Sequence, residues 1–135
     1  MTLLDATPPK PPRKIGRYIL VAMALIIIAA VCFVVFRNLP EERAVSRFLT
    51  TLEKGNYREA YQLWQPSSTY NYADFLHDWV EPGDYGKIRT FKILGSRSKG
   101  KSTVVVTVTI NNEEPPCELL VDRSTKGLAY VPPDF

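Results

Sequence analysis

Histidine and cysteine are scarce in this chain of 135 residues, which has one histidine, His77, and two cysteines, Cys32 and Cys117. Zinc sites built from such side chains need four ligands at short spacings, so a metal cluster of the usual kind is excluded. We also expect no nucleophile elbow, no phosphate-binding loop and no dinucleotide fingerprint. The composition therefore predicts a protein without a cofactor and without a clear catalytic motif.

Charged residues, proline and glycine are missing from Tyr18–Phe36, a run of 19 residues that is almost entirely apolar. A helix of that length rises about 28 Å, close to the ~30 Å hydrocarbon core of a bilayer. Ile15 and Gly16 can extend the helix at its start. We predict a transmembrane helix over residues 15–37 that anchors the chain in the lipid bilayer.

Three alternatives to an uncleaved anchor are a signal peptide, a lipoprotein leader and a buried core helix. A signal peptide has a shorter apolar region and a small-residue cleavage site, whereas this run ends in Phe33–Phe36. Cys32 follows Val31 and not a small residue, which disfavours lipidation. A core helix would need more chain around it than this sequence has. An uncleaved anchor fits best.

The charges beside the apolar run predict its orientation. Four cations precede it: Lys10, Arg13, Lys14 and Arg17. On the other side, Arg37 is followed closely by Glu41 and Glu42. By the positive-inside rule the N-terminus is cytoplasmic and residues 38–135 are periplasmic or extracellular, at a bacterial cytoplasmic membrane.

The excess positive charge of the chain, +3 overall, belongs to the N-terminal tail and its flank, since residues 38–135 are close to neutral. Cations in this position orient the transmembrane helix in the membrane, and the near-neutral domain argues against a nucleic-acid partner. Four prolines interrupt residues 1–14, namely Pro8, Pro9, Pro11 and Pro12. We expect this segment to be a disordered cytoplasmic tail.

Residues 38–80 predict three helices. Pro40 suits the first turn of the first helix, and Gly55 suits its end. The apolar stripe of this helix is Ala44, Val45, Phe48, Leu49 and Leu52. Asn56 and Glu59 have the spacing of a capping box for a second helix, and a third begins near Asn71 or Thr69.

Residues 87–131 predict four strands. They are Lys87–Ser96, Thr103–Ile110, Cys117–Asp122 and Leu128–Val131. The second alternates clearly, with Val104, Val106, Val108 and Ile110 on one face and Thr103, Val105, Thr107 and Thr109 on the other. Short turns between consecutive strands require antiparallel pairing. The predicted fold class for 38–135 is α+β, with about three helices packed on a four-stranded antiparallel sheet.

This order of elements resembles the nuclear transport factor 2-like superfamily, also described as cystatin-like. The resemblance is carried by AVSRFLTTLEKGNYREAYQLW (44–64), by YNYADFLHDW (70–79) and by the alternating valines. It covers nearly all of residues 41–131, although Leu128-Ala129-Tyr130 stands where members often have a tryptophan. It implies a membrane-anchored bacterial member whose fold has a concave pocket between helices and sheet. It implies no reaction, because members range from enzymes to assembly modules.

Two clusters are candidate sites. Enzymes of this superfamily use histidine with a carboxylate, and His77 has Asp74 and Asp78 close by in the sequence. If His77 faces solvent, it is only a polar flank of the third helix. The second cluster is aromatic: Tyr57, Tyr61, Trp64, Tyr70, Tyr72, Phe75 and Trp79. Core packing explains most of these rings, and the alternative is a pocket or partner surface at Tyr57, Tyr61, Trp64, Tyr72 and Trp79.

A basic stretch surrounds the first hairpin: Lys87, Arg89, Lys92, Arg97, Lys99 and Lys101. Such a stretch usually protects a sheet edge from aggregation, and contact with anionic lipid or an acidic partner is the alternative.

The sequence as a whole predicts a membrane-anchored domain that binds a ligand or a protein and has no catalytic activity. One alternative is a single-pass accessory subunit of a larger membrane complex. The other is a pocket enzyme that uses His77 with Asp74 or Asp78. The expected partners are the bilayer and a protein of unknown identity, and homo-oligomers are left open.

Overall fold

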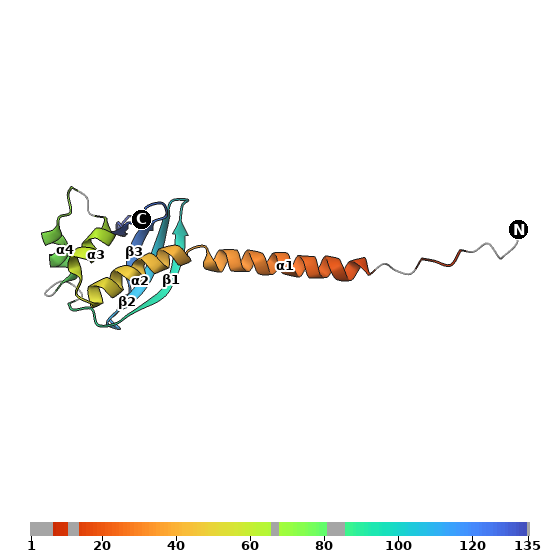
Figure 1. The fold of residues 1–135 in the computed structure, drawn as a ribbon, viewed down its shortest axis with the longest axis horizontal. Coiled ribbons are helices and arrows are strands. Elements are labelled where there is room, and N and C mark those ends of the chain that lie inside the picture. Colours follow the sequence, from red (N-terminus) through yellow and green to blue (C-terminus); the bar gives the residue numbers. More distant parts are fainter. Residues whose placement is uncertain (1–6, 11–13, 66–67, 81–85, 135) are drawn as a thin grey trace, which may run out of the picture. The chain divides into compact units, whose positions relative to one another are not determined.

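The computed structural model describes residues 7–10, 14–65, 68–80 and 86–134 (Figure 1). The chain divides into two units, Met1–Phe36 and Arg37–Phe135. The first unit contains α1 (Ile15–Phe36), which has no buried residue and is long and apolar enough to cross a membrane. The long apolar helix is therefore confirmed. Of the predicted disordered tail, residues 7–10 are in no helix or strand, and 1–6 and 11–13 lie outside the described residues.

The second unit has an α+β fold. Its described residues form α2 (Leu39–Glu53), α3 (Tyr57–Trp64), α4 (Tyr72–Trp79), β1 (Phe91–Lys99), β2 (Thr103–Ile110), β3 (Cys117–Asp122) and β4 (Leu128–Tyr130). The strands make one open antiparallel sheet in the order β1-β2-β3-β4. Figure 1 shows α2 lying along one face of this sheet, and α2 contacts β1, β2 and β3. The predicted fold class is confirmed at this level.

The core lies between α2 and the sheet because both present an apolar face there. Val45, Phe48 and Leu49 of α2 are fully buried, as the stripe predicted. They meet the buried residues of β2 and β3, which are Val104, Val106, Val108, Ile110, Cys117, Leu119 and Val121. This packing fixes α2 on the sheet.

The junction between α2 and α3 corrects the predicted capping box. Gly55 has a φ of +79°, and its N–H donates to Leu52 O while Asn56 N–H donates to Thr51 O. These two bonds close α2 in a Schellman motif. The N–H of Asn56 is thus not available to the Glu59 carboxylate, which a capping box would require. The Asn56 side chain makes no cap hydrogen bond, and the Glu59 carboxylate lies near Arg47. The prediction of a box at this helix was wrong.

A capping box is present at the next helix. Asp74 N–H donates to Asn71 Oδ1 at 3.0 Å, and Asn71 N–H donates to Asp74 Oδ2 at 3.1 Å. Asn71 has extended backbone angles, as an N-cap requires. The predicted start of this helix is confirmed.

The first strand begins later than predicted, at Phe91 and not at Lys87. The Asn111 side chain holds the preceding segment outside the sheet: its Oδ1 accepts from Arg89 N–H at 2.7 Å, and its Nδ2 donates to Lys87 O at 3.0 Å. The pairing register also shifts between Ile93 and Gly95. The extra residue of this bulge explains why the strand does not alternate.

The second strand matches its predicted bounds, with one surprise on its outer face. Val105 is 0% exposed although it belongs to the face opposite the core. Its neighbours across the strands are Arg97 and Leu120. Arg97 reaches over β2 to Glu118 on β3, with Nη1 2.6 Å from Oε1 and Nη2 3.2 Å from Oε2. This bidentate ion pair crosses β2 on the outer face of the sheet.

Candidate functional site

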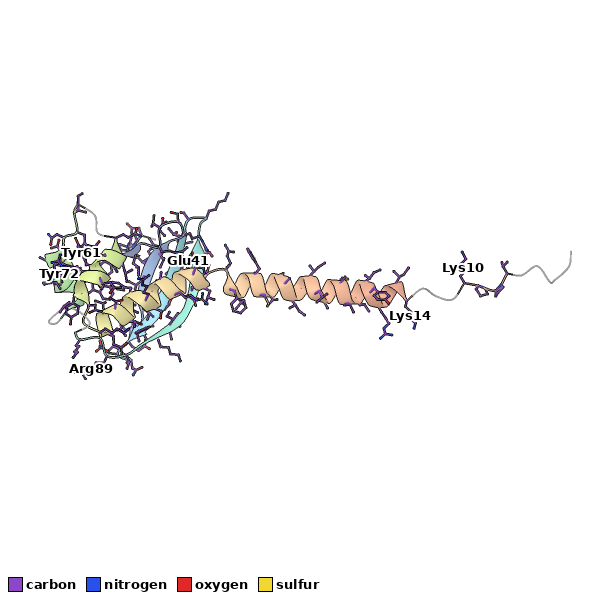
Figure 2. All side chains as sticks on the ribbon, viewed as in Figure 1. Lys10, Lys14, Glu41, Tyr61, Tyr72 and Arg89 are labelled. Carbon is purple, nitrogen blue, oxygen red and sulfur yellow. The ribbon has the colours of Figure 1, made fainter. Side chains whose placement is uncertain are left out.

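The predicted aromatic site divides into a buried and a half-buried set. Trp64 and Trp79 are buried in the core, where both contact Phe48, at ring distances of 5.3 Å and 5.1 Å. Tyr57, Tyr61 and Tyr72 are partly buried at the margin of the core. Figure 2 labels Tyr61 and Tyr72, whose rings lie 5.3 Å apart on α3 and α4. Packing thus accounts for the two tryptophans.

Tyr130 completes this cluster, and sequence reasoning missed it. Its ring stacks on Trp79 at 5.9 Å and lies 4.9 Å from Trp64. Asp78 Oδ2 accepts from the Tyr70 hydroxyl at 2.8 Å and from the Tyr130 hydroxyl at 3.4 Å. Burial is the main cause that raises the pKa of both phenols. For Tyr70 the Asp78 carboxylate adds to it, and for Tyr130 the Tyr70 phenol and then Asp78 add to it. Both tyrosines therefore remain neutral donors that fix Asp78.

His77 lies in solvent, with 86% of its side chain exposed. Its Nδ1 is 3.4 Å from Asp78 Oδ1, whereas Asp74 is held by the cap of α4. Of the two predicted carboxylate partners, the structure therefore brings only Asp78 to the ring. Among the described residues, no group of three or more His, Cys, Asp or Glu is placed to hold a metal ion.

One segment does have the spacing of a phosphate-binding loop, which our expectation overlooked. Residues 95–102 read GSRSKGKS, in agreement with Gly-x-x-x-x-Gly-Lys-Ser. In that motif the loop leads into a helix, whose N-terminal N–H groups bind phosphate. Here the segment is the end of β1 and the turn into β2. The required strand–loop–helix is not formed, so the match is a coincidence of spacing.

The basic stretch does not form a single site. Lys87 and Arg89 precede β1, Lys92 and Lys99 lie on β1, and Arg97 is paired with Glu118. Lys101 belongs to the hairpin turn.

A hollow of the second unit lies between α2, α3 and the β3–β4 turn, and we call it the α2 groove. Its volume is about 390 Å³. The apolar lining comes from Pro40, Ala44, Leu63 and Leu128. The polar lining comes from Arg43, Arg47, Gln62, Gln65, Thr125 and Lys126. The groove therefore combines an apolar surface with three cations.

A buried carboxylate fixes the β3–β4 turn beside α2. Glu41, whose side chain is 2% exposed, has Oε1 2.8 Å from Lys126 Nζ and 3.5 Å from Arg123 Nη1. Arg123 Nη2 also donates to Asn38 Oδ1 at 2.7 Å and to Ser98 Oγ at 2.8 Å. Figure 2 labels Glu41 on the first turn of α2. These contacts join the start of α2 to the end of β1 and to the β3–β4 turn, whose Lys126 lines the groove.

The turn is also ordered from within. Asp122 Oδ1 accepts from the Ser124 hydroxyl at 2.6 Å and from the N–H groups of Ser124 and Thr125. The Ser124 hydroxyl and these N–H groups lower the pKa of Asp122 to about 2, so the carboxylate is charged at neutral pH.

Gln65 closes the groove by joining the end of α3 to the same turn. Its Nε2 donates to Thr125 O at 2.6 Å. A Cβ at Gly127 would come within 2.5 Å of Gln65 Oε1, so glycine leaves room for this contact. The groove is thus built from three segments that are distant in sequence.

Two of the groove's cations have little or nothing to neutralise them. Arg43 makes no hydrogen bond or ion pair with another described residue, and it is exposed. Arg47 has only Glu59 nearby, at 3.8 Å between two largely exposed side chains. Exposed pairs of this kind contribute little. Both guanidinium groups can accept an anionic ligand.

A comparison with models of protein families, with curated proteins and with solved structures finds no match for this chain.

Proposed function

We propose that this protein is a membrane-anchored binding module without catalytic activity. α1 is the anchor, and the domain at 37–135 presents the α2 groove to a partner. The observation that carries the proposal is the groove itself, a preformed hollow with an apolar surface and two cations available for an anion. The exposure of His77 agrees with a role other than general acid–base catalysis.

The location follows from α1 and its flanks. An uncleaved helix over Tyr18–Phe36 holds the chain in the cytoplasmic membrane of a bacterium. The cations before α1 keep the N-terminus in the cytoplasm, so the domain is on the outer side. The α+β fold and the residues 44–64 support membership of the nuclear transport factor 2-like superfamily.

Photo-crosslinking tests the groove as a binding site. We replace Gln62 with a photoreactive phenylalanine derivative in the full chain, and Lys101 in a matched control. Both positions are exposed, but only Gln62 lines the groove. In bacterial cells that express the protein, we expect a discrete crosslinked product from position 62 alone. Ala44→Trp, which fills the groove, should abolish this product while the protein stays folded.

Equal products from both positions, or none from either, would contradict the binding module. A product that persists with Ala44→Trp would place the partner elsewhere.

A further inference from the structure

We propose that the α2 groove recognises an acidic peptide segment, with an apolar side chain in the hollow and carboxylates along α2. This inference rests on the proposed binding function and names the chemistry of its ligand. The partner is a protein that carries such a segment. Its carboxylates pair with the cations and set its position along α2, and one of its apolar side chains enters the hollow.

Three cations lie in a line along α2 and its C-cap residue, Lys54. Arg43, Arg47 and Lys54 are separated by four and then seven residues, which places them within about 40° on one helix face. They extend over about 16 Å of helix at ~1.5 Å per residue. Of these three, only Arg47 makes an ion pair with another described residue, the contact with Glu59 at 3.8 Å.

The surface beside this line of cations is hollowed along its length. A second hollow, of about 400 Å³, also contains Arg43 and Arg47 and continues to Lys54 and Asn56. The two hollows therefore form a track along α2, apolar where Ala44 and Leu63 line it and polar further on. Glu59 is the one acidic residue among those that line them.

Length decides between a small ligand and a peptide. One small carboxylate can neutralise one or two of these cations, whereas about five extended residues at ~3.3 Å each cover the whole line. Shape decides between a peptide and a lipid surface, because a plane of headgroups leaves a recessed apolar hollow empty. A peptide satisfies both features, and the Arg side chains can bind its carboxylates with two hydrogen bonds each.

A binding titration tests the inference with the full chain in neutral detergent micelles. The probe is a peptide of three Glu-Glu-Leu repeats with an uncharged fluorophore, followed by anisotropy. Two further peptides replace every Glu with Lys or every Leu with Ser. We expect saturable binding of the Glu-Leu probe, at least tenfold weaker binding of the other two, and weakening when salt is raised from 0.05 to 0.5 M.

Charge reversal locates the binding. Arg43→Glu with Arg47→Glu should raise the Kd at least tenfold. Lys92→Glu with Lys101→Glu makes the same change of charge at the first hairpin and should leave the Kd within about twofold. Near-ultraviolet circular dichroism shows whether each variant keeps the native packing, and single substitutions at Arg43 and Arg47 replace the double variant if it does not.

Several results would overturn the acidic segment. They are the absence of saturable binding up to 1 mM probe, equal affinity for the three peptides, and equal loss in both double variants. Vesicles of phosphatidylglycerol that bind through Arg43 and Arg47 while the probe does not would identify lipid as the occupant. If any of these results is obtained while position 62 still crosslinks a partner, only the proposal of an acidic segment is rejected. If position 62 gives no crosslinked product, the proposed binding function is rejected as well.

Discussion

Glu41 carries its carboxylate at a position where almost no water reaches it. Burial of a charge is costly, and here Lys126 and Arg123 compensate it at 2.8 Å and 3.5 Å. The other carboxylate oxygen, Oε2, is buried and has no hydrogen-bond partner among the residues that the structure describes. The intact ion cluster therefore adds little to the net free energy of folding, and its main effect is to hold the β3–β4 turn in place.

Removal of the Glu41 carboxylate should be severe. Glu41→Ala leaves Arg123 and Lys126 without their counter-charge, and both are only partly exposed, so we expect the free energy of unfolding to fall by about 3 kcal/mol. Unfolding of the full chain in detergent by urea, followed by tryptophan fluorescence, measures this, because both tryptophans lie in the second unit.

Glu53→Ala is the matched control. Glu53 is an exposed glutamate of the same helix, and its loss should change the free energy of unfolding by less than about 0.5 kcal/mol. A similar effect of the two substitutions would mean that the Glu41 cluster does not hold the fold.

The sequence indicated Glu41 only as an acidic residue that follows the apolar run. Its partners Arg123 and Lys126 lie more than eighty residues away, and no local pattern indicates that such a pair is buried. Tyr130 was missed for a similar reason, since a ring in a three-residue strand has no periodicity. The start of α4 was predictable, because its cap is formed by Asn71 and Asp74, which are only three residues apart in the sequence.

At the scale of elements, β2 is buried on both faces around its centre. Val106 faces the helices, and Val105, on the other face, is paired with Arg97, whose bridge to Glu118 crosses the strand. The centre of β2 is therefore dry on both faces. The outer face of this sheet is thus uneven, with a dry centre and half-exposed threonines around it.

Val105→Thr tests this burial with almost no change of shape. A hydroxyl in a dry site lacks hydrogen-bond partners, so we expect a loss of about 1–3 kcal/mol in the free energy of unfolding. The reverse exchange at the same face, Thr109→Val, should stay within about 0.5 kcal/mol because Thr109 is half-exposed. Urea unfolding of the two variants measures both effects. A cost below 0.5 kcal/mol for Val105→Thr would show that water reaches the site.

The strands with strict alternation were predictable from the sequence, and β2 and β3 have the predicted bounds. β1 was displaced because its register shift and the Asn111 contacts depend on the partner strand and on a distant turn. The groove was not predictable at all. Its lining comes from 40–47, 62–65 and 125–128, and only the fold brings these segments together.

At the scale of the whole molecule, the orientation of the chain in the membrane remains our prediction. Protease added to intact spheroplasts should remove the domain and leave an epitope on the N-terminal tail untouched, because the cations before α1 retain that end in the cytoplasm. Immunoblots against both ends, with lysed spheroplasts as the control, report the result. Protection of the domain in intact spheroplasts, or a mature N-terminus within residues 18–40, would refute this topology.

The contacts of Asn38 have a mechanical consequence. Only Arg37 and Asn38 separate α1 from α2, so a pull on the domain through α1 enters the fold at this point. The Asn38 side chain is bonded to Ser98 at the end of β1 and to Arg123 after β3. We therefore expect a load applied through α1 to pass sideways into the sheet before the first turn of α2 unwinds. The domain would then resist tension at its junction with α1.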